Sequence, residues 1–266
     1  MSLPAWSGAF EDLSTVRALP LPGDAREWAW GGSTGAGIKV AVVDSGVDGG
    51  HPAVGGVDGY VATVPDPDSE SGVRFVDGKH DDLVGHGTAC AGIIRSLAPD
   101  VEIYSVRVLG ENLKGKGALF LAGIEWAIDN GMDVVNMSLS SKSPNLFGPL
   151  HDVADDAYFG NTVLVCAANN APGPTYPSQF ASVVSVAATS GQDPYTLAYN
   201  PNPPVEFAAI GIDIEVPWTG GSIVATGNSF AAPHVAGLTA LIRAKHPDLT
   251  AFQVKAVLHA ASQNAR

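Results

Sequence analysis

The sequence predicts an α/β fold: a single doubly wound domain with a mostly parallel central sheet and helices on both faces. Short apolar runs rich in β-branched residues alternate along the chain with stretches of helical periodicity. The 266 residues are 45% hydrophobic and 15% charged, enough apolar material for one large core. No internal repeat and no Pro-, Gly- or Ser-rich linker divides the chain. We therefore expect one domain over 1–266, with 1–26 as an N-terminal extension packing on it.

The apolar runs predict the strands and the periodic stretches predict the helices. The strands are expected at residues 38–43, 101–108, 132–139, 162–168, 183–188 and 205–209. The helices are expected at 117–130, 151–159, 229–245 and 250–262. Gly131 is a C-terminal cap, and Thr250 with Gln253 forms a capping box. Open parallel sheets bind ligands at the carboxyl ends of their strands, so a functional site is expected where the apolar runs end.

Charge and composition exclude several classes of protein. Lys and Arg total 14 against 27 Asp and Glu, a net charge of −13 without a basic cluster, so no nucleic-acid partner is expected. No apolar run reaches the ~18 residues of a membrane span, so no membrane partner is expected. The first residues lack the pattern of a secretory signal, which predicts a cytoplasmic protein unless a leader was removed. Cys90 and Cys166 allow at most one disulfide.

Three segments carry the groups from which catalysis is predicted. Asp44 lies in 43–48, His86 in 85–92 and Ser229 in 227–237, with glycines close to each. A carboxylate, an imidazole and a hydroxyl are the groups of a serine-nucleophile triad, and Asp, His, Ser is one of its known chain orders. The glycines would let the backbone of a substrate approach these groups.

With these segments in this order, the sequence resembles the subtilisin-like serine proteases, the subtilase family, over about residues 27–262. Shorter matches lie at 98–99, 106–110, 136–139 and 176–177. The resemblance implies that Ser229 attacks the scissile carbonyl, that His86 transfers the proton and that Asp44 orients the imidazole. It also implies a peptide or protein substrate, and we expect a monomer.

Asn170 matches the asparagine of the family's oxyanion hole. The spacing from Cys166 favours Asn170 over Asn169 for this role. Its side-chain amide and the Ser229 backbone N–H would donate hydrogen bonds to the tetrahedral intermediate. Asn169 stands where the family has glycine, so we expect a positive φ there.

The serine segment differs from the family pattern beside the nucleophile. The usual Gly-Thr-Ser-Met becomes Gly-Asn-Ser-Phe at 227–230. Ser229 is expected to open a helix, whose positive N-terminal end favours an oxyanion. Pro233 is expected among the first unpaired amides of that helix, where a missing N–H costs little.

The resemblance also places the substrate-binding residues. Leu113, Lys114 and Gly115 would form one edge of the cleft, and Ser138, Leu139 and Ser140 the other, with Ala168 and Asn169 beside the oxyanion asparagine. Ser140 and Ser141 replace the family's two glycines, so we expect a narrower pocket. Lys114 and Lys116 would favour acidic substrate residues, although loop lysines are more often merely solvated.

No cofactor is expected, and the family's high-affinity calcium site is predicted to be absent. Residues 93–97 run directly into Ala98-Pro99 without the calcium loop, and Ala53 replaces the calcium aspartate. Calcium takes six to eight oxygen ligands, and this site has lost several of them. Two alternatives remain for the acidic stretch before His86: a solvated loop or a different cation site. Its six carboxylates are Asp66, Asp68, Glu70, Asp77, Asp81 and Asp82.

The remaining reactive residues are expected to be structural. Cys90 would pack beneath His86 as a small buried hydrophobe, and Cys166 would lie in the core. A bridge between them is compatible with the sequence but is not expected in the cytoplasm. His234 is not expected to be the general base.

The sequence thus predicts a serine endopeptidase that processes a peptide or precursor inside the cell. Two alternatives are a peptide ligase or macrocyclase that uses the same acyl-enzyme, and a catalytically idle module that only binds peptides. Ligation depends on how well water is excluded, which a sequence does not show.

Overall fold

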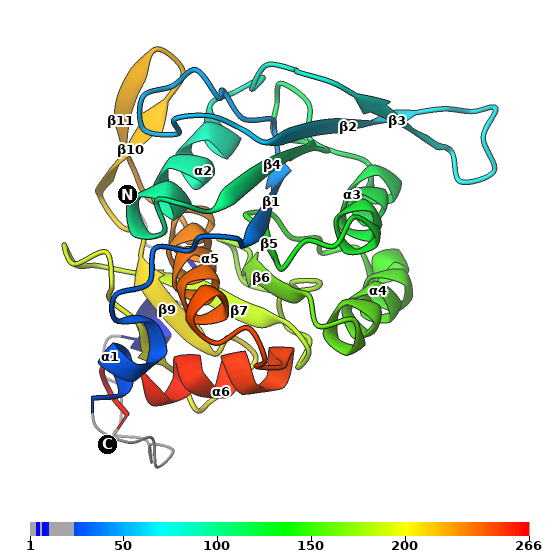
Figure 1. The fold of residues 1–266 in the computed structure, drawn as a ribbon. Coiled ribbons are helices and arrows are strands. Elements are labelled where there is room, and N and C mark those ends of the chain that lie inside the picture. The colour runs from blue at the N-terminus through cyan, green and yellow to red at the C-terminus, as the bar shows by residue number, and fades with distance from the viewer. Residues whose placement is uncertain (1–3, 6, 11–23, 266) are drawn as a thin grey trace.

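A computed structural model describes residues 4–5, 7–10 and 24–265 of the chain (Figure 1). Its main sheet has nine strands in the order β3-β2-β4-β1-β5-β6-β7-β9-β8. The pairs β2–β3 and β8–β9 are antiparallel and the others are parallel. The strands are β1 (Lys39–Asp44), β2 (Gly59–Pro65), β3 (Val73–Asp77), β4 (Glu102–Arg107), β5 (Val134–Met137), β6 (Val163–Ala167), β7 (Val184–Thr189), β8 (Ala198–Tyr199) and β9 (Phe207–Ile210).

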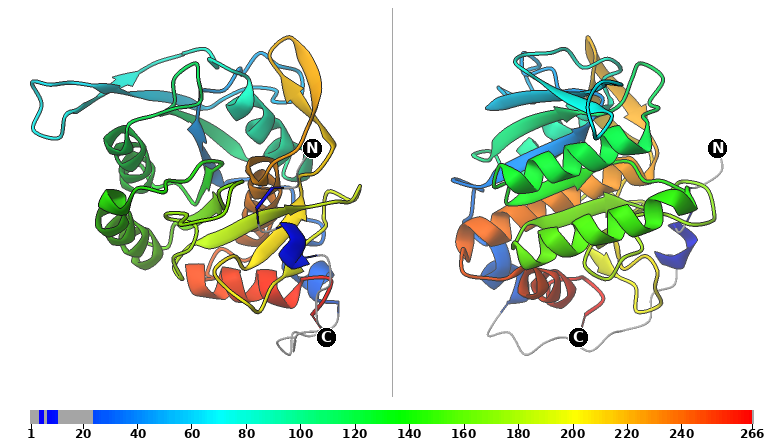
Figure 2. Two further views of the ribbon diagram at one scale, coloured as in Figure 1. Left: turned by 180° about the vertical axis from the view of Figure 1, so that it is seen from behind. Right: turned by 90° about the vertical axis from the view of Figure 1, so that its right-hand side faces the viewer.

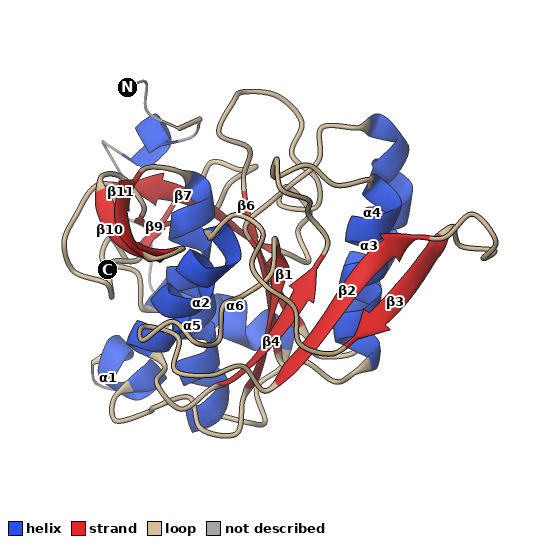
Figure 3. Ribbon diagram, turned by 90° about the horizontal axis from the view of Figure 1, so that it is seen from above, coloured by secondary structure: helices blue, strands red, loops and turns tan. Residues whose placement is uncertain are grey.

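Helices cover both faces of this sheet. They are α1 (Ala25–Trp30), α2 (His86–Leu97), α3 (Gly117–Asp129), α4 (Phe147–Phe159), α5 (Asn228–Lys245) and α6 (Ala251–Ala260), with short 3-10 helices η1 (Ser7–Phe10) and η2 (Pro144–Leu146). Helices α3 and α4 lie on one face, while α2 and α5 lie on the other with α1 and α6 (Figures 2 and 3). The predicted doubly wound α/β fold is confirmed.

Strand β1 shows why its apolar run is continuous. Its residues alternate between two cores, because successive side chains of a strand point to opposite faces. Val40 and Val42 belong to the core under α2 and α5, whereas Ala41 and Val43 belong to the core under α3 and α4. A strand covered on both faces therefore needs apolar residues at every position.

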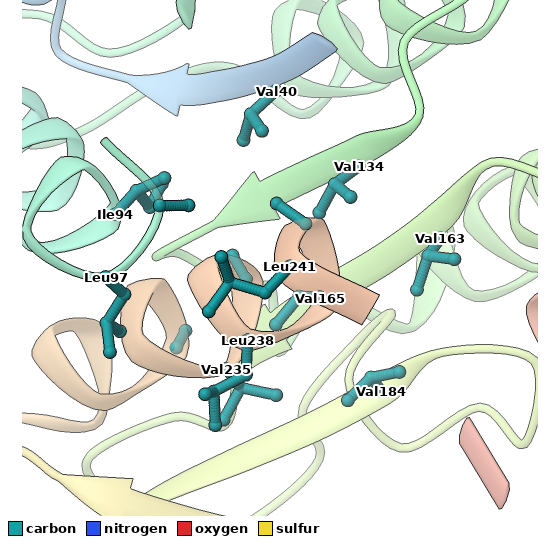
Figure 4. Close-up of a cluster of buried hydrophobic side chains, with 14 of the residues drawn as sticks. Val40, Ile94, Leu97, Val134, Val163, Val165, Val184, Val235, Leu238 and Leu241 are labelled. Carbon is teal, nitrogen blue, oxygen red and sulfur yellow. The ribbon is translucent and has the colours of Figure 1, made fainter. Parts of the chain in front are cut away.

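Helix α5 lies at the centre of the larger core. Its Val235, Leu238 and Leu241 point toward the valines of β1, β5, β6 and β7 (Figure 4). Ile94 and Leu97 of α2 close the same cluster from the side. Because α5 packs against the sheet, α1, α2 and α6, most of its residues are buried, and its N-terminal turn is held in one place.

Several elements were not anticipated from the sequence. Helix α1, the β2–β3 hairpin, the short β8 and a second, separate hairpin of β10 (Ile214–Trp218) and β11 (Gly221–Ala225) were missed, and α4 begins at Phe147 instead of residue 151. The two hairpins lie at the periphery and expose apolar residues such as Phe75 and Val224. Their sequences therefore lack the continuous apolar run that identified the central strands.

The described N-terminal residues contact the domain near the end of β6, where the Ala5 N–H donates to the Asn170 carbonyl at 2.6 Å. Phe10 is buried in a cluster with Ala168 and residues of β7, β8 and β9. Residues 11–23 of the expected extension lie outside the described residues. Among the helices that the structure describes, none has both the length and the apolar character needed to cross a membrane.

Candidate active site

The predicted catalytic residues lie where the sheet and two helices meet. Asp44 ends β1, and Asn170 follows β6. His86 is the first residue of α2, and Ser229 is the second residue of α5. Because β1, β5 and β6 are adjacent parallel strands, their carboxyl ends form one edge, and both helices begin beside it.

Asp44 and His86 form a buried ion pair. His86 Nδ1 lies 2.8 and 3.0 Å from the two carboxylate oxygens of Asp44. Asp44 is 0% exposed and His86 7% exposed. Burial lowers the pKa of His86, but the charge and the hydrogen bond of Asp44 outweigh it, so the pKa is raised above its usual value. Gly85, with φ 109°, makes the tight left-handed turn that delivers His86 to the start of α2.

Aromatic rings enclose the imidazole. Phe230 lies 5.3 Å from His86 and Trp218 lies edge-on at 6.3 Å, measured between ring centroids. Trp218 comes from the β10–β11 hairpin, so an element that the sequence did not reveal helps to bury the pair. Low local polarity strengthens the attraction between the carboxylate and the imidazolium.

Ser229 lies beside this pair at the N-terminus of α5. Cys90 Sγ lies 3.9 Å from Asp44 Oδ2 and 3.8 Å from the carbonyl of Ser229, so both groups lie next to the same thiol. Within the described residues no hydrogen bond joins Ser229 Oγ to the imidazole of His86. Catalytic hydrogen bonds of this kind often tighten only when the substrate is bound.

The structure corrects the explanation given for Pro233. Pro233 lies inside α5, past the first turn, so its missing N–H would have been the partner of the Ser229 carbonyl four residues earlier. The Ser138 hydroxyl donates to that carbonyl instead, at 2.7 Å. Ser138 Oγ in turn accepts hydrogen bonds from Asn136 Nδ2 and Cys90 Sγ, both at 3.1 Å. A side chain assigned to substrate binding therefore holds the turn that carries the nucleophile.

The side-chain amide of Asn170, the predicted oxyanion donor, is held in one orientation. Its Oδ1 accepts from the Asn228 backbone N–H at 2.9 Å, which fixes the side-chain amide and leaves Nδ2 as the donor. A Cβ atom built on Gly227 would lie 3.5 Å from Asn170 Nδ2 and 3.1 Å from Ser229 Oγ, so both atoms border the same small space. The missing side chain of Gly227 thus keeps open the gap that a tetrahedral oxygen requires.

Asn169 is held away from this role. Its Nδ2 donates to the Pro174 carbonyl at 3.1 Å and its backbone N–H to Thr175 Oγ1 at 3.0 Å. Among the described residues, the non-glycine positions with positive φ are Leu113, Asn161 and Asp213. The positive φ predicted for Asn169 is therefore wrong, because bonds to residues 174 and 175 hold it in an ordinary conformation.

Asn228 is a supporting residue that sequence reasoning missed. Its buried side chain accepts from the Ala188 N–H at 2.8 Å. Its Nδ2 donates to the carbonyls of Ala5, Ala168 and Asn169 at 3.0, 3.1 and 3.3 Å. It thereby ties the start of α5 to β7, to the end of β6 and to the N-terminal segment. The available signal was the asparagine that replaces the family's threonine before the nucleophile.

The two predicted edges of the substrate cleft meet around one cavity. Leu113, Lys114 and Gly115 line it on one side, and Leu139 and Ser140 on the other, enclosing about 320 Å³. Ser138, Ala168 and Asn169 do not line this cavity, although all three follow β5 or β6. Ser140 Oγ accepts from Thr175 Oγ1 at 3.2 Å, so the extra side chain in this edge is itself anchored.

The residues at the expected calcium position do not fit calcium. Helix α2 runs without an inserted loop from His86 to Leu97, and the Ala53 N–H donates to His51 Nδ1 at 3.1 Å. The nearby carbonyls of Val54, Gly56, Pro99 and Val101 all accept hydrogen bonds from the guanidinium group of Arg95. Carbonyl oxygens that would suit a hard cation are thus already bound to a cationic side chain.

One carboxylate of the acidic stretch before His86, Asp82, is bound by the protein, whereas Asp68, Glu70, Asp77 and Asp81 are exposed. Asp82 accepts hydrogen bonds from the Ser45 hydroxyl, from the backbone N–H groups of Val84 and Gly85, and from both donors of Thr88, at 2.7 to 3.0 Å. Burial raises the pKa of Asp82, but these hydrogen bonds outweigh it and lower the pKa overall. Asp82 therefore fixes the start of α2 behind His86.

The six carboxylates do not gather into a cation site in the part of the chain that the structure describes. The His, Cys, Asp and Glu side chains close enough there to share an ion are Asp44, His86 and Cys90. These are the predicted catalytic pair and the buried thiol beside it, and none of them belongs to the six carboxylates.

The other reactive side chains are structural. Cys90 and Cys166 are both free and buried, so no disulfide joins them. Burial raises the pKa of the Cys90 thiol well above its usual value, with the charge of Asp44 adding to the effect, which disfavours the thiolate. Burial also lowers the pKa of His234 to about 4, and its Nδ1 pairs with the Phe230 carbonyl at 2.9 Å.

The chain is similar to known proteins over most of its length. The profile of the subtilase family matches residues 35–266. The chain is 37% identical to subtilisin of Bacillus pumilus over 240 residues, which cover 84% of this chain and 83% of that protein. It is also 37% identical to subtilisin E of Bacillus subtilis (strain 168), of which it spans 60% of the length.

The fold has a close structural counterpart. The crystal structure of a cold adapted subtilisin-like serine proteinase superimposes with a TM-score of 0.68 at 26% sequence identity, over 95% of this chain and 89% of that one. The profile, the sequence relatives and the structural neighbour agree on the family. The chain therefore belongs to the subtilase family of serine proteases.

Proposed function

We propose that this protein is a serine endopeptidase that hydrolyses peptide bonds through an acyl-enzyme on Ser229. The observation that supports this most directly is the buried Asp44–His86 pair, with its 2.8 Å hydrogen bond, beside a serine at a helix N-terminus. A peptide-binding module would have no use for a buried carboxylate and imidazole in this geometry.

The residues divide the reaction between them. His86 takes the proton of Ser229 as the hydroxyl oxygen attacks the scissile carbonyl, and Asp44 stabilises the imidazolium that forms. Asn170 Nδ2 and the Ser229 N–H donate to the oxyanion. His86 then protonates the leaving amine, and a water molecule releases the acyl group by the same steps in reverse.

A fluorophosphonate probe tests this proposal directly. We expect stoichiometric labelling of Ser229 by mass spectrometry, and loss of peptide hydrolysis by about 10⁶-fold in Ser229→Ala, the order found for the nucleophile of subtilisin-type triads. Equal labelling of the wild type and Ser229→Ala would overturn the proposal. Adding an amine nucleophile to the peptide assay separates hydrolysis from ligation by the mass of the product.

We propose a processing role inside the cell, on peptides or protein precursors, for a monomeric enzyme. Two buried free cysteines fit a reducing compartment, since a disulfide is not needed for this fold. Fractionation of the native host tests the location, and sedimentation tests the oligomeric state. Recovery of the protein only from the culture medium would contradict the intracellular proposal.

We further propose that the enzyme works without the family's high-affinity calcium ion, with the guanidinium of Arg95 joining the carbonyls at that position. We expect EDTA to leave the Tm unchanged. Arg95→Gln removes charged donors from four carbonyls and should lower the Tm, whereas Arg74→Gln, an exposed arginine elsewhere, should not. A large fall in the Tm of the wild type with EDTA would contradict the proposal.

A further inference from the structure

A second cavity lies on the outer side of the cleft edge. It encloses about 540 Å³ and is lined by the end of β2, by Leu83 and by residues of the segment that follows β4. It shares Leu109, Lys114, Gly115 and Lys116 with the cavity of the substrate cleft, so the two cavities adjoin along this stretch of chain. We call it the cationic cavity, after Arg107, Lys114 and Lys116 in its lining.

The charge of this cavity is opposite to that of the whole protein. The chain carries a net charge of −13, yet three of its 14 basic residues line this one cavity. No carboxylate is among the lining residues. Within the described residues, Arg107, Lys114 and Lys116 form no ion pair with an acidic side chain, and the guanidinium of Arg107 makes one long hydrogen bond, 3.4 Å, to the Asp81 carbonyl.

The cavity begins next to the catalytic aspartate. Arg107 pairs with Asp44 across β1 and β4, and the backbone N–H groups of Val108 and Leu109 donate to the Asp44 carbonyl at 2.9 and 3.1 Å. Leu83, which also lines the cavity, donates its backbone N–H to the Ser45 carbonyl at 3.1 Å. A peptide placed for attack by Ser229 therefore has this cavity within reach of a side chain close to the scissile bond.

The lining of the cavity combines apolar and cationic residues. Val64, Pro65, Leu83 and Leu119 supply apolar surface, and the cations supply the charge. A side chain with an apolar stem and a terminal carboxylate, such as glutamate, matches this combination. Uncharged or basic side chains would leave the three cations without a counter-charge.

We propose that the cationic cavity binds an acidic side chain of the substrate and makes the enzyme selective for peptides with glutamate or aspartate near the scissile bond. The inference rests on the proposed protease function and names its substrate class. The acidic surface elsewhere does not oppose it, because charges beyond the Debye length, about 8 Å at physiological salt, are largely screened. The three cations that line the cavity would act on a bound carboxylate over distances shorter than the Debye length.

The test uses pairs of fluorogenic peptides that differ by glutamate or glutamine at a single position on either side of the cleaved bond. At one position we expect kcat/KM to be roughly 3- to 10-fold higher for glutamate at physiological salt, about 0.15 M, the size expected of a few partly exposed ion pairs. The preference should shrink toward 1 at 0.5 M salt because the charges are screened. The double variant Lys114→Gln/Lys116→Gln should lose most of it, and Arg107→Gln part of it.

Lys39→Gln is the matched control, since it removes the same charge at the opposite end of β1 from Asp44 and should keep the preference. Binding of the same peptide pairs to Ser229→Ala by fluorescence anisotropy gives a readout that needs no turnover. Cleavage of the glutamine peptides with no advantage for glutamate at any position would overturn the inference and leave the protease function standing. Absence of cleavage of every peptide would overturn the protease function, and equal Kd values for both peptides would then overturn the inference too.

Discussion

The two halves of the active site are held together in different ways. Asp44 and His86 contact each other directly through a buried ion pair. Ser229 and Asn170 are positioned indirectly: Ser138 bonds the Ser229 carbonyl, and Asn228 bonds Asn170 and the ends of β6 and β7. The first half depends on two residues that the sequence motifs already identify. The second depends on neighbours whose importance shows only in three dimensions.

Among the substitutions that keep the Ser229 nucleophile, the largest effect is expected on the direct half. Asp44→Asn should lower kcat by about 10⁴-fold, because the imidazole loses the partner that fixes its tautomer and stabilises its charged form. Hydrolysis of a chromogenic peptide at saturating substrate measures it. A loss below about 10-fold would mean that His86 does not depend on Asp44.

The pH dependence of activity is a second test of the Asp44–His86 pair. Since His86 must be neutral to act as the base and its pKa is raised, activity should fall as the pH drops through a value above 6.5. Asp44→Asn removes the charge and the hydrogen bond that do most to raise this pKa. Burial, which lowers the pKa, is then opposed only by the charge of Asp82, so the acid limb of kcat/KM should move to lower pH. An unchanged acid limb would contradict this assignment.

The oxyanion hole should show the next largest effect. Asn170→Ala should lower kcat by about 10²- to 10³-fold with little change in KM, since its donor acts on the tetrahedral oxygen and less on the substrate. Asn169→Ala is the matched control, and its effect should stay within a few-fold because its amide bonds Pro174. The reverse ranking of the two variants would assign the role to Asn169.

Asn228→Ala should act mainly on stability. It leaves the buried Ala188 N–H and the Ala168 carbonyl without their side-chain partner, which should cost about 1–3 kcal/mol in the free energy of unfolding. For a chain of this size, that corresponds to a fall in Tm of roughly 2–4 °C per kcal/mol, read by calorimetry. Asn202→Ala, an exposed asparagine, should change the free energy by less than about 0.5 kcal/mol.

Ser138→Ala should give the smallest of these effects. It removes the donor to the Ser229 carbonyl and should cost about 1 kcal/mol. Pro233→Ala would restore a backbone N–H that can pair with that carbonyl. The double variant should therefore be more stable than the sum of the two single changes predicts. Simple additivity would show that Ser138 does not compensate for the proline.

The central strands and the triad could be read from the sequence because their signals are local. A strand buried on both faces must be apolar throughout, as in β1, and glycine-flanked catalytic residues keep recognisable spacing. The β2–β3 and β10–β11 hairpins could not be read in this way, because they are half exposed and carry mixed residues. Trp218 was missed as a neighbour of His86 for that reason.

The supporting contacts join residues far apart in the chain. Asn228 forms hydrogen bonds with Ala5 and Ala188, and Ser138 forms one with Ser229. Arg95 donates to carbonyls that precede β2 in the sequence and to carbonyls that follow it. Each bond depends on how buried polar groups find partners once the layers have packed, which is a property of the whole fold. Two predictions were wrong because they depended on such contacts. Pro233 does not lie at an unpaired amide, and Asn169 does not have a positive φ.

The sequence by itself determined the fold class and the chemical groups of the site, because periodicity follows from secondary structure and catalysis requires particular side chains. Only the tertiary structure decided which groups hold those side chains in place, which cations share a cavity beside Asp44, and which polar atoms remain paired. Those outcomes follow from packing, which brings distant segments within hydrogen-bond distance, and packing has no local signature in the chain.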